Sequence, residues 1–107
     1  MSITSDTIRG HTDTIILSRL AKGDSYGYEI NKMILRATDN VYELKDATLY
    51  SAFRRLEEAG LIASYWGGEG AGARRRYYSI TESGRRFYSQ SRAAWEEARG
   101  IIDKLIY

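Results

Sequence analysis

Residues 46–66 have the sequence DATLYSAFRRLEEAGLIASYW, and the spacing of apolar side chains changes partway along this stretch. In the first part the apolar residues recur with the period of one helix face: Leu49, Ala52, Phe53 and Leu56. Asp46 is suited to be the N-cap of this helix, and Gly60 is suited to end it. Residues 61–66 are rich in strand-forming side chains. The stretch therefore predicts a helix followed at once by a β-strand.

A second strand is predicted over residues 74–80, RRRYYSI, on the far side of a glycine-rich turn at 67–72. Together, residues 61–80 are expected to form an antiparallel hairpin. A two-stranded hairpin is only marginally stable by itself, so it must pack against the helices. The residues expected to anchor it there are Leu61, Ile62 and Ile80.

Helical patterns lie on both sides of this region. One spans residues 6–22 and is ended by Gly23, and another follows Ser25, its expected N-cap. The apolar residues of this second helix share one face: Tyr26, Ile30, Met33, Ile34 and Ala37. A long final helix is capped by Thr81 and continues almost to the end of the chain. This order predicts a mainly α fold with a small β-hairpin, a winged helix-turn-helix with a long C-terminal helix.

The composition limits the classes of function. A chain of 107 residues, 43% hydrophobic and 28% charged, can enclose one hydrophobic core. It has no cysteine, which excludes disulfide and thiolate chemistry and favours a reducing cytoplasm. No uninterrupted apolar segment indicates a secretion signal or a membrane span. His11 is the single histidine, expected at the surface, and no phosphate-binding glycine motif is present, so we expect no enzyme, metal site or cofactor.

Charge is unevenly distributed, although the net charge is only +2. Between Ala73 and Arg92 there is a single acid, Glu82. The same segment contains six arginines: Arg74, Arg75, Arg76, Arg85, Arg86 and Arg92. A local basic patch is what a DNA-binding module needs, although most charged runs are only solvated faces.

Two groups of residues are the predicted DNA contacts. The outward face of the helix at 46–60 carries small, hydrogen-bonding and basic side chains suited to the major groove: Ala47, Thr48, Tyr50, Ser51, Arg54 and Arg55. The second group follows the hairpin tip and can contact phosphates or enter the minor groove: Arg74, Arg75 and Arg76. The alternative interpretation is an ordinary amphipathic surface helix beside arginines that protect a strand edge.

The final helix has a seam of small and apolar residues with heptad-like spacing: Phe87, Ser91, Ala94, Ala98, Ile101 and Leu105. With Ile102, this seam predicts a homodimer interface to which residues 6–22 contribute. Trp95 lies among the small residues Ser91, Ala94 and Ala98, which leave room for a planar molecule. Candidate pocket walls on the first helix are Thr7, Ile8, Asp13, Thr14 and Leu17. Alternatively, Trp95 packs in the dimer core.

An ordered set of motifs resembles the PadR family of winged helix transcriptional regulators and covers most of the chain. The motifs are GDSYGYEI at 23–30, ATLY at 47–50, RLE at 55–57, GLI at 60–62, SYW at 64–66, RRYY at 75–78 and ITESG at 80–84. The chain is most similar to the short branch of the family with one C-terminal helix, which includes multidrug-responsive repressors. The resemblance implies a homodimer that represses transcription.

In drug-binding members of that branch, planar aromatic compounds bind between two tryptophans, one from each subunit. Trp95 stands at the corresponding place, 14 residues after Thr81. Many relatives begin the recognition helix with Ser-Pro, where this chain has Lys45-Asp46, so a negative charge comes close to the DNA. Drug-binding relatives carry an acid one turn after the tryptophan, where this chain has Arg99. The resemblance therefore implies neutral or anionic ligands rather than cations.

These observations predict one domain, 1–107. Residues 1–80 form its DNA-binding part, with the wing at 61–80, and residues 81–107 form the dimerisation helix. The expected function is a repressor that binds double-stranded operator DNA as a homodimer and is released by a planar aromatic compound. Two alternatives are a winged helix module that binds a protein partner and a DNA-binding regulator without a ligand. The salt dependence of binding distinguishes the first alternative from a DNA-binding protein, because affinity for DNA falls steeply with salt concentration and apolar association does not.

Overall fold

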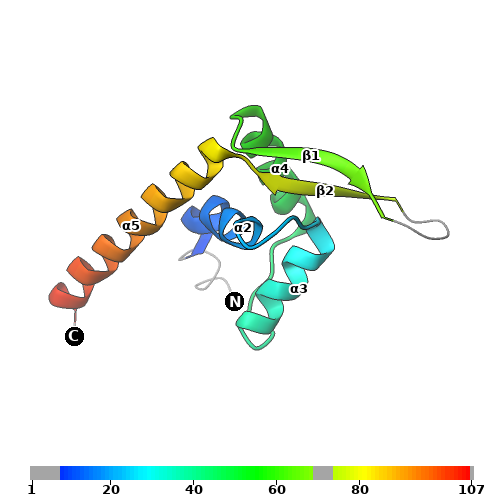
Figure 1. Ribbon diagram of the computed structural model, residues 1–107. Helices are drawn as coiled ribbons and strands as arrows, with labels where there is room; N and C mark the ends of the chain where they lie inside the picture. Colours follow the sequence, from blue (N-terminus) through cyan, green and yellow to red (C-terminus); the bar gives the residue numbers. More distant parts are fainter. Residues whose placement is uncertain (1–7, 69–73, 107) are drawn as a thin grey trace.

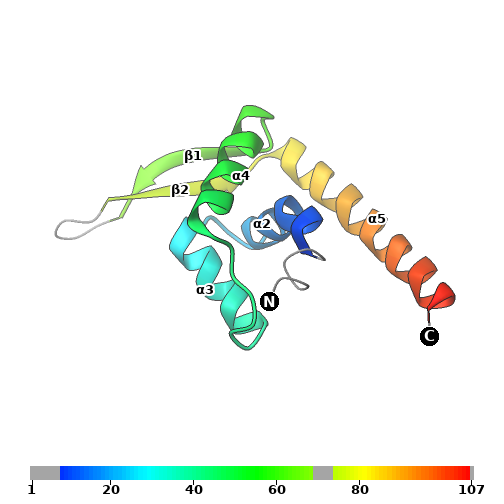
Figure 2. The same cartoon turned by 180° about the vertical axis from the view of Figure 1, so that it is seen from behind.

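The computed structural model describes residues 8–68 and 74–106 (Figure 1). In chain order its elements are η1 (Arg9–His11), α2 (Thr12–Leu20), α3 (Gly27–Ala37), α4 (Asp46–Glu58), β1 (Ile62–Gly67), β2 (Arg75–Ile80) and α5 (Glu82–Leu105). The two strands form an antiparallel hairpin. The predicted winged helix fold is thereby confirmed. The hairpin and α5 project from opposite sides of the helical body (Figure 1 and Figure 2).

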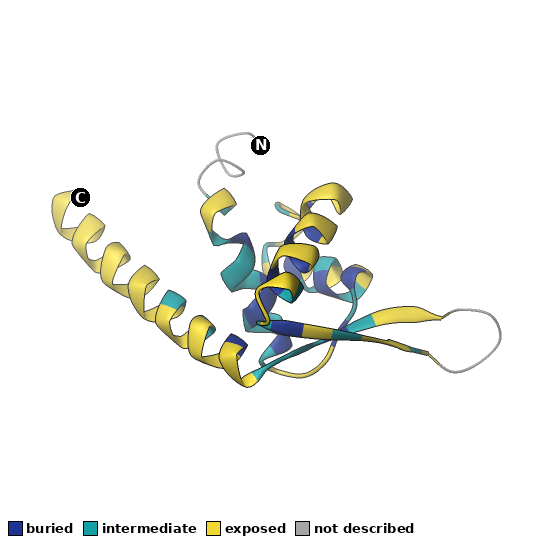
Figure 3. Cartoon of the chain, turned by 90° about the horizontal axis from the view of Figure 1, so that it is seen from above, coloured by how far each residue is buried: buried dark blue, intermediate teal, exposed yellow. Residues whose placement is uncertain are grey.

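The hydrophobic core lies where α2, α3 and α4 meet the base of the hairpin (Figure 3). Its buried side chains are Ile16, Leu17, Leu20, Ile30, Ile34, Leu44, Leu49, Ala52, Phe53, Leu56, Ile62 and Tyr78. Phe53 of α4 stacks on Tyr78 of β2, with ring centroids 3.9 Å apart. Burying a large apolar side chain contributes about 1.5–3 kcal/mol. This packing fixes the position of α4 relative to the hairpin.

Helix α4 ends at the predicted place but does not begin with the predicted cap. Gly60 has a φ of +75°, and the N–H groups of Gly60 and Leu61 donate to the carbonyls of Glu57 and Leu56, each at 3.0 Å. This Schellman arrangement satisfies carbonyls that the helix end leaves unpaired. The prediction of Asp46 as N-cap was wrong, because the extended residue before it is the N-cap and Asp46 is the first helical residue.

The base of the hairpin is joined to the segment before α3. The N–H of Ser25 donates to the carbonyl of Tyr78 at 3.2 Å, and the N–H of Tyr78 donates to the carbonyl of Ser25 at 2.8 Å. Ser25 therefore forms an isolated bridge to the hairpin, and its prediction as the N-cap of α3 was wrong; Tyr26 is the N-cap. Ile62 is buried and Leu61 and Ile80 pack against the core, as predicted, but Tyr78 is a further anchor.

The first helix is shorter than the predicted span of residues 6–22. Its α-helical part is Thr12–Leu20, preceded by the 3-10 turn of η1. Positions 6 and 7 lie outside the described residues. The prediction that Gly23 ends this helix was wrong, because α2 ends at Leu20 with Ala21 as its C-cap. Gly23, in the turn that follows, has a φ of +145°, which favours glycine.

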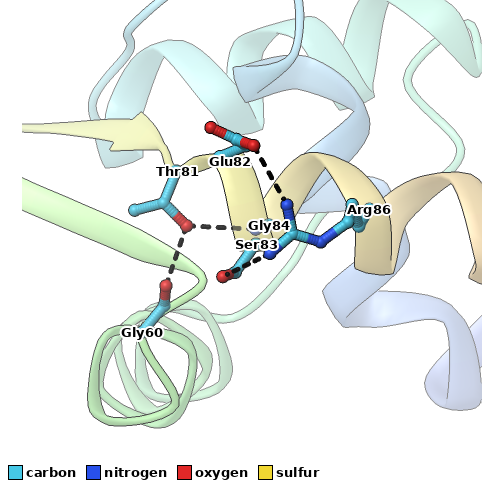
Figure 4. A network of polar contacts seen from close by, with 6 residues as sticks. All are labelled: Gly60, Thr81, Glu82, Ser83, Gly84 and Arg86. Carbon is cyan, nitrogen blue, oxygen red and sulfur yellow. Dashed lines mark hydrogen bonds and ion pairs between the residues drawn. The ribbon is translucent and has the colours of Figure 1, made fainter.

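Helix α5 begins at a polar junction with the turn that connects α4 to β1 (Figure 4). The hydroxyl of Thr81 accepts a hydrogen bond from the N–H of Gly84 at 3.0 Å and donates to the carbonyl of Gly60 at 2.8 Å. This confirms Thr81 as the cap. A Cβ on Gly84 would lie 2.1 Å from the carbonyl oxygen of Leu61, so only glycine fits there. No described helix, α5 included, is long and apolar enough to cross a membrane.

Candidate nucleic-acid interface and aromatic groove

The outward face of α4 is accessible along its whole length. All six predicted contact residues on this helix are exposed: Ala47, Thr48, Tyr50, Ser51, Arg54 and Arg55. The ring of Tyr50 lies against Phe53 and over the first turn of α3, where a Cβ on Gly27 would come within 2.6 Å of the Tyr50 hydroxyl. The absence of a side chain at Gly27 therefore allows Tyr50 to lie between α3 and α4.

An open concave surface lies between this face of α4 and the hairpin and encloses about 730 Å³. The residues that line it are Tyr26, Gly27, Tyr28, Tyr50, Arg54, Glu57, Trp66, Arg74, Arg75, Arg76 and Tyr78. The structure thus brings two predicted helix residues, Tyr50 and Arg54, to the same surface as all three wing arginines. Tyr26, Tyr28 and Trp66 are additional aromatic residues that sequence reasoning did not place there.

Trp66 is the aromatic centre of the wing. It is 56% exposed, and the guanidinium groups of Arg74 and Arg76 lie 5.4 and 5.8 Å from its ring centroid. Arg75 points to the other strand face and lies 4.9 Å from the ring of Tyr26. The observed register places Trp66 directly opposite Arg76, so the two side chains share one face of the hairpin.

The three wing arginines differ in how far their charge is already compensated. Arg76 lies 3.6 Å from a carboxylate oxygen of Glu57 and donates to the hydroxyl of Ser64 at 2.8 Å. Ser64 in turn donates to Glu57 at 2.6 Å. The side chain of Arg76 is therefore held by contacts with α4 and β1, and Arg74 and Arg75 carry more of the charge available to a phosphate. The glycine-rich tip at 69–73 lies outside the described residues.

The outer part of the hairpin is tied to the body by aromatic and polar contacts. Tyr65 and Tyr77 stack with centroids 5.6 Å apart, and Tyr77 meets Tyr26 edge-on at 5.2 Å. The hydroxyl of Tyr65 donates to Asp24 at 2.6 Å, and this hydrogen bond, with desolvation, raises the pKa of Tyr65. The contacts hold the wing at a fixed angle to α3, which preorganises its arginines.

On the opposite side of α4, a second concave surface runs to the start of α2. Its lining residues are Arg9, Gly10, Thr12, Asp13, Thr48, Ser51 and Arg55. Asp13 forms an ion pair with Arg55. The prediction that Asp13 lines the tryptophan pocket was therefore wrong: successive helix residues differ by about 100° in direction, and Asp13 faces α4.

A groove of about 750 Å³ surrounds Trp95, between α2 and α5. Its lining residues are Ile8, His11, Thr14, Ile15, Ser18, Lys22, Met33, Tyr88, Arg92 and Trp95. His11 meets Trp95 edge-on, with ring centroids 4.8 Å apart, and the hydroxyl of Tyr88 donates to Ser18 at 3.3 Å. The described residues contain no group of His, Asp and Glu that could hold a metal ion.

Only some of the predicted ligand-site residues meet in this groove. Ile8, Thr14 and Trp95 line it. The remaining lining residues were missed because they come from several elements that are far apart in the sequence: η1, α2 and the turn after it, α3 and α5. Leu17 was wrongly predicted as a wall, because it has no exposed surface and belongs to the core. Four other predicted residues lie along α5 outside the lining set: Ser91, Ala94, Ala98 and Arg99. Thr7 lies outside the described residues.

Helix α5 leaves most of its apolar side chains uncovered. Of its residues, only Gly84 is buried. The predicted interface residues are all exposed: Phe87, Ile101, Ile102 and Leu105. Figure 3 shows this as an almost continuous exposed surface along α5, in contrast to the buried patches of the helical body.

Comparison with known proteins gives one family. The model of the transcriptional regulator PadR-like family matches residues 16–90. The chain is similar to the structure of a transcriptional regulator from Clostridium thermocellum, with 52% identity and a TM-score of 0.87 over 96% of this chain and 100% of that one. A PadR family transcription regulator from Clostridium difficile is 34% identical, with a TM-score of 0.79 over 91% of this chain and 99% of that one.

A curated protein of Lysinibacillus sphaericus without an assigned function is 44% identical over 101 residues, which cover 94% of this chain and 93% of that protein. The family model spans the core helices, the hairpin and the start of α5, so it includes both the outward face of α4 and the wing. This chain belongs to the PadR-like family of transcriptional regulators.

Proposed function

We propose that this protein is a ligand-responsive repressor that binds operator DNA as a homodimer. The observation that carries the proposal is the shared concave surface on which the exposed face of α4 meets the wing arginines. In this proposal, α4 enters the major groove, where Tyr50 and Ser51 contact base edges and Arg54 reaches a base edge and an adjacent phosphate. Arg74 and Arg75 contact phosphates or the adjacent minor groove.

The homodimer is supported by α5. A 24-residue helix that buries a single residue within its own chain needs another surface to cover Phe87, Ile101 and Leu105. Pairing with the same helix of a second copy would cover these residues and relate two α4 helices by a two-fold axis. Two recognition helices at a fixed spacing are what a two-fold symmetric operator requires.

The ligand is proposed to be a planar aromatic compound, neutral or anionic, held between Trp95 and its symmetry mate. Trp95 is 40% exposed and lines the groove, so one ring face is available for stacking. Lys22 and Arg92 are the charged lining residues, which favours a neutral or anionic ligand. Because α2 and α5 form both the groove and the proposed dimer contact, a ligand that favours one spacing of the subunits changes DNA affinity by linkage.

DNA binding is tested with duplex DNA from upstream of the chain's own gene, measured by fluorescence anisotropy over a series of KCl concentrations. Substituting Arg74, Arg75 and Arg76 by Ala should weaken binding to all sequences and reduce the salt slope by about 0.9 for each phosphate that is no longer neutralised. Since Arg76 is paired with Glu57, we expect Arg76→Ala alone to change the slope least. An unchanged slope in the triple variant would count against the wing as a DNA contact. No salt-dependent binding to any duplex would favour a module for protein partners instead.

Ligand binding is tested separately. In a Trp66→Phe background, Trp95 is the only tryptophan, and neutral or anionic planar dyes should change its fluorescence at micromolar concentration, about 8 kcal/mol of binding free energy. Cationic planar dyes should bind more weakly. Trp95→Ala should abolish the calorimetric signal of dye binding while DNA binding is retained. Equal dye binding by wild type and Trp95→Ala would leave a DNA-binding regulator whose tryptophan only packs.

A further inference from the structure

Asp13 and Arg55 join the first helix of the body to the recognition face. Asp13 lies in the first turn of α2, and Nη2 of Arg55 in α4 donates to its Oδ1 in an ion pair between residues 42 positions apart. The Asp13 side chain is 32% exposed, whereas that of Arg55 is 57% exposed. The acid is the more enclosed partner, and it lies in the first turn of its helix. Asp13 is therefore the fixed member of the pair.

The pair lies inside the proposed DNA-binding surface. Thr48, Ser51 and Arg55 follow one another at spacings of three and four on α4, so they share a helix face. All three line the concave surface whose other wall, on α2, carries Asp13. A carboxylate at this place adds a negative charge where α4 would approach DNA, which is itself negatively charged.

Arg54, the preceding residue on the same helix, provides the contrast. Both arginines are exposed, but Arg54 points to the wing side of α4 and has no carboxylate within ion-pair distance among the described residues. An unpaired guanidinium is available to a phosphate of any sequence. A guanidinium that is neutralised by a neighbouring carboxylate keeps its other N–H donors but loses most of its attraction for a general polyanion.

We propose that Asp13 is a specificity-determining residue, which neutralises Arg55 and so withdraws it from non-specific attraction to phosphates. The proposal rests on the proposed function, in which α4 binds DNA. In the pair, Arg55 is held by one nitrogen and presents its remaining donors to a base edge next to Thr48 and Ser51. Asp13 touches no DNA itself and acts through the position and charge of Arg55.

The test compares four proteins on two duplexes, the DNA upstream of the chain's own gene and a scrambled duplex of the same composition. Asp13→Asn should bind both duplexes more tightly, with a salt slope steeper by about 0.9 for each recognition helix on the DNA. Its preference for the upstream DNA should fall, because the freed Arg55 now contacts any phosphate. The double variant Asp13→Asn/Arg55→Gln should return to the wild-type slope, since the pair as a whole contributes no net charge.

Arg54→Gln is the matched control and should flatten the slope by about 0.9 for each helix. If Arg54→Gln and the Asp13 variants all leave the slope unchanged, α4 is not the DNA-binding face and the proposed function fails. If Arg54→Gln flattens the slope but Asp13→Asn alters neither slope nor preference, only the role of Asp13 is overturned. A double variant with a flatter slope than wild type would also overturn it, because Arg55 would then contact phosphate despite its partner. An exposed ion pair contributes little to stability, so all four proteins should melt at similar temperatures.

Discussion

Helices α4 and α5 are both amphipathic, but only α4 has its apolar face covered within the chain. The buried residues of α4 are Leu49, Ala52, Phe53 and Leu56, spread over a helix of 13 residues. Helix α5 has 24 residues, and Gly84 is the only buried one. The polar face of α4 is therefore held rigidly toward solvent by a completed core, whereas the apolar face of α5 still lacks a partner. A helix of the first kind suits recognition, and one of the second kind suits assembly.

Phe53→Ala should have the largest effect on this comparison. The ring is buried and stacked on Tyr78, and truncating a buried Phe costs about 3–5 kcal/mol in free energy of unfolding. Urea unfolding followed by circular dichroism measures the change. Phe87→Ala on α5 is the matched control, and both substitutions are made in a chain that also carries Ile101→Asp and Leu105→Asp, so that dimerisation adds nothing to the cost. Phe87→Ala should then cost less than half as much, since Phe87 is 39% exposed within the chain. Equal destabilisation at the two positions would mean that the fold depends on the packing of α5 as much as on the packing of α4.

Substituting both Ile101 and Leu105 by Asp should separate assembly from folding. Placing charges on the exposed apolar end of α5 should weaken self-association at least about 100-fold, or about 2.8 kcal/mol. The core of the body should be unaffected, because neither residue is part of it. Sedimentation velocity measures the state of association and circular dichroism the fold. A double variant that remains a dimer would place the interface on another surface.

Gly84→Ala tests how α5 is attached to the body. The new Cβ would lie 2.1 Å from the Leu61 carbonyl oxygen and 2.7 Å from Ile80, so the backbone must shift, and overpacking of this kind costs about 1–3 kcal/mol. Gly100→Ala on the same helix has open space around it and should be neutral or stabilise the helix. Thermal melting compares the two. Similar melting temperatures for both variants would contradict a tight junction at Gly84.

The smallest expected effect is a pH dependence of stability that comes from Tyr78, which is buried beneath α4. Burial raises the pKa of Tyr78 above its ordinary value near 10. The folded protein therefore keeps this proton at a pH where the unfolded chain has released it, so stability should fall as the pH rises above about 10. Tyr78→Phe should reduce that fall, whereas Tyr28→Phe, at an exposed position, should not. Urea midpoints at pH 8 and pH 10.5 measure the difference; parallel decreases in both variants would rule out Tyr78 as its source.

Much of the fold follows from local patterns in the sequence. The change from helical to alternating spacing after Gly60 and the capping threonine at position 81 mark the hairpin and α5 because these signals depend on neighbouring residues alone. The helix caps at Asp46 and Ser25 were predicted wrongly, and for Ser25 the reason is a contact that is distant in the sequence. Ser25 pairs with Tyr78, more than fifty residues away, and no local pattern reveals a partner at that separation.

The candidate sites show the same division. The exposed residues of α4 could be identified because the periodicity of a single helix shows which side chains face outward. The groove around Trp95 was identified only in part, since α2, α3 and α5 each contribute to it. Helix α2 has apolar residues in several directions, so the spacing does not separate Leu17, which is buried, from Ile15, which lines the groove. Asp13 was assigned to the wrong side of the helix for the same reason.

The junction at Thr81 and Gly84 makes α5 a lever arm. At 1.5 Å per residue its 24 residues extend for about 36 Å from this junction. A tilt of about 5° at the base displaces the far end by about 3 Å, and the same geometry works in reverse. If the far end is held by a second copy, as proposed, a movement of a few ångströms there becomes a rotation of a few degrees at the base of the wing. The hydrogen bond from Thr81 to Gly60 passes that rotation directly to the end of α4, so the angle between the two elements proposed to contact DNA and the long axis of α5 changes as one unit.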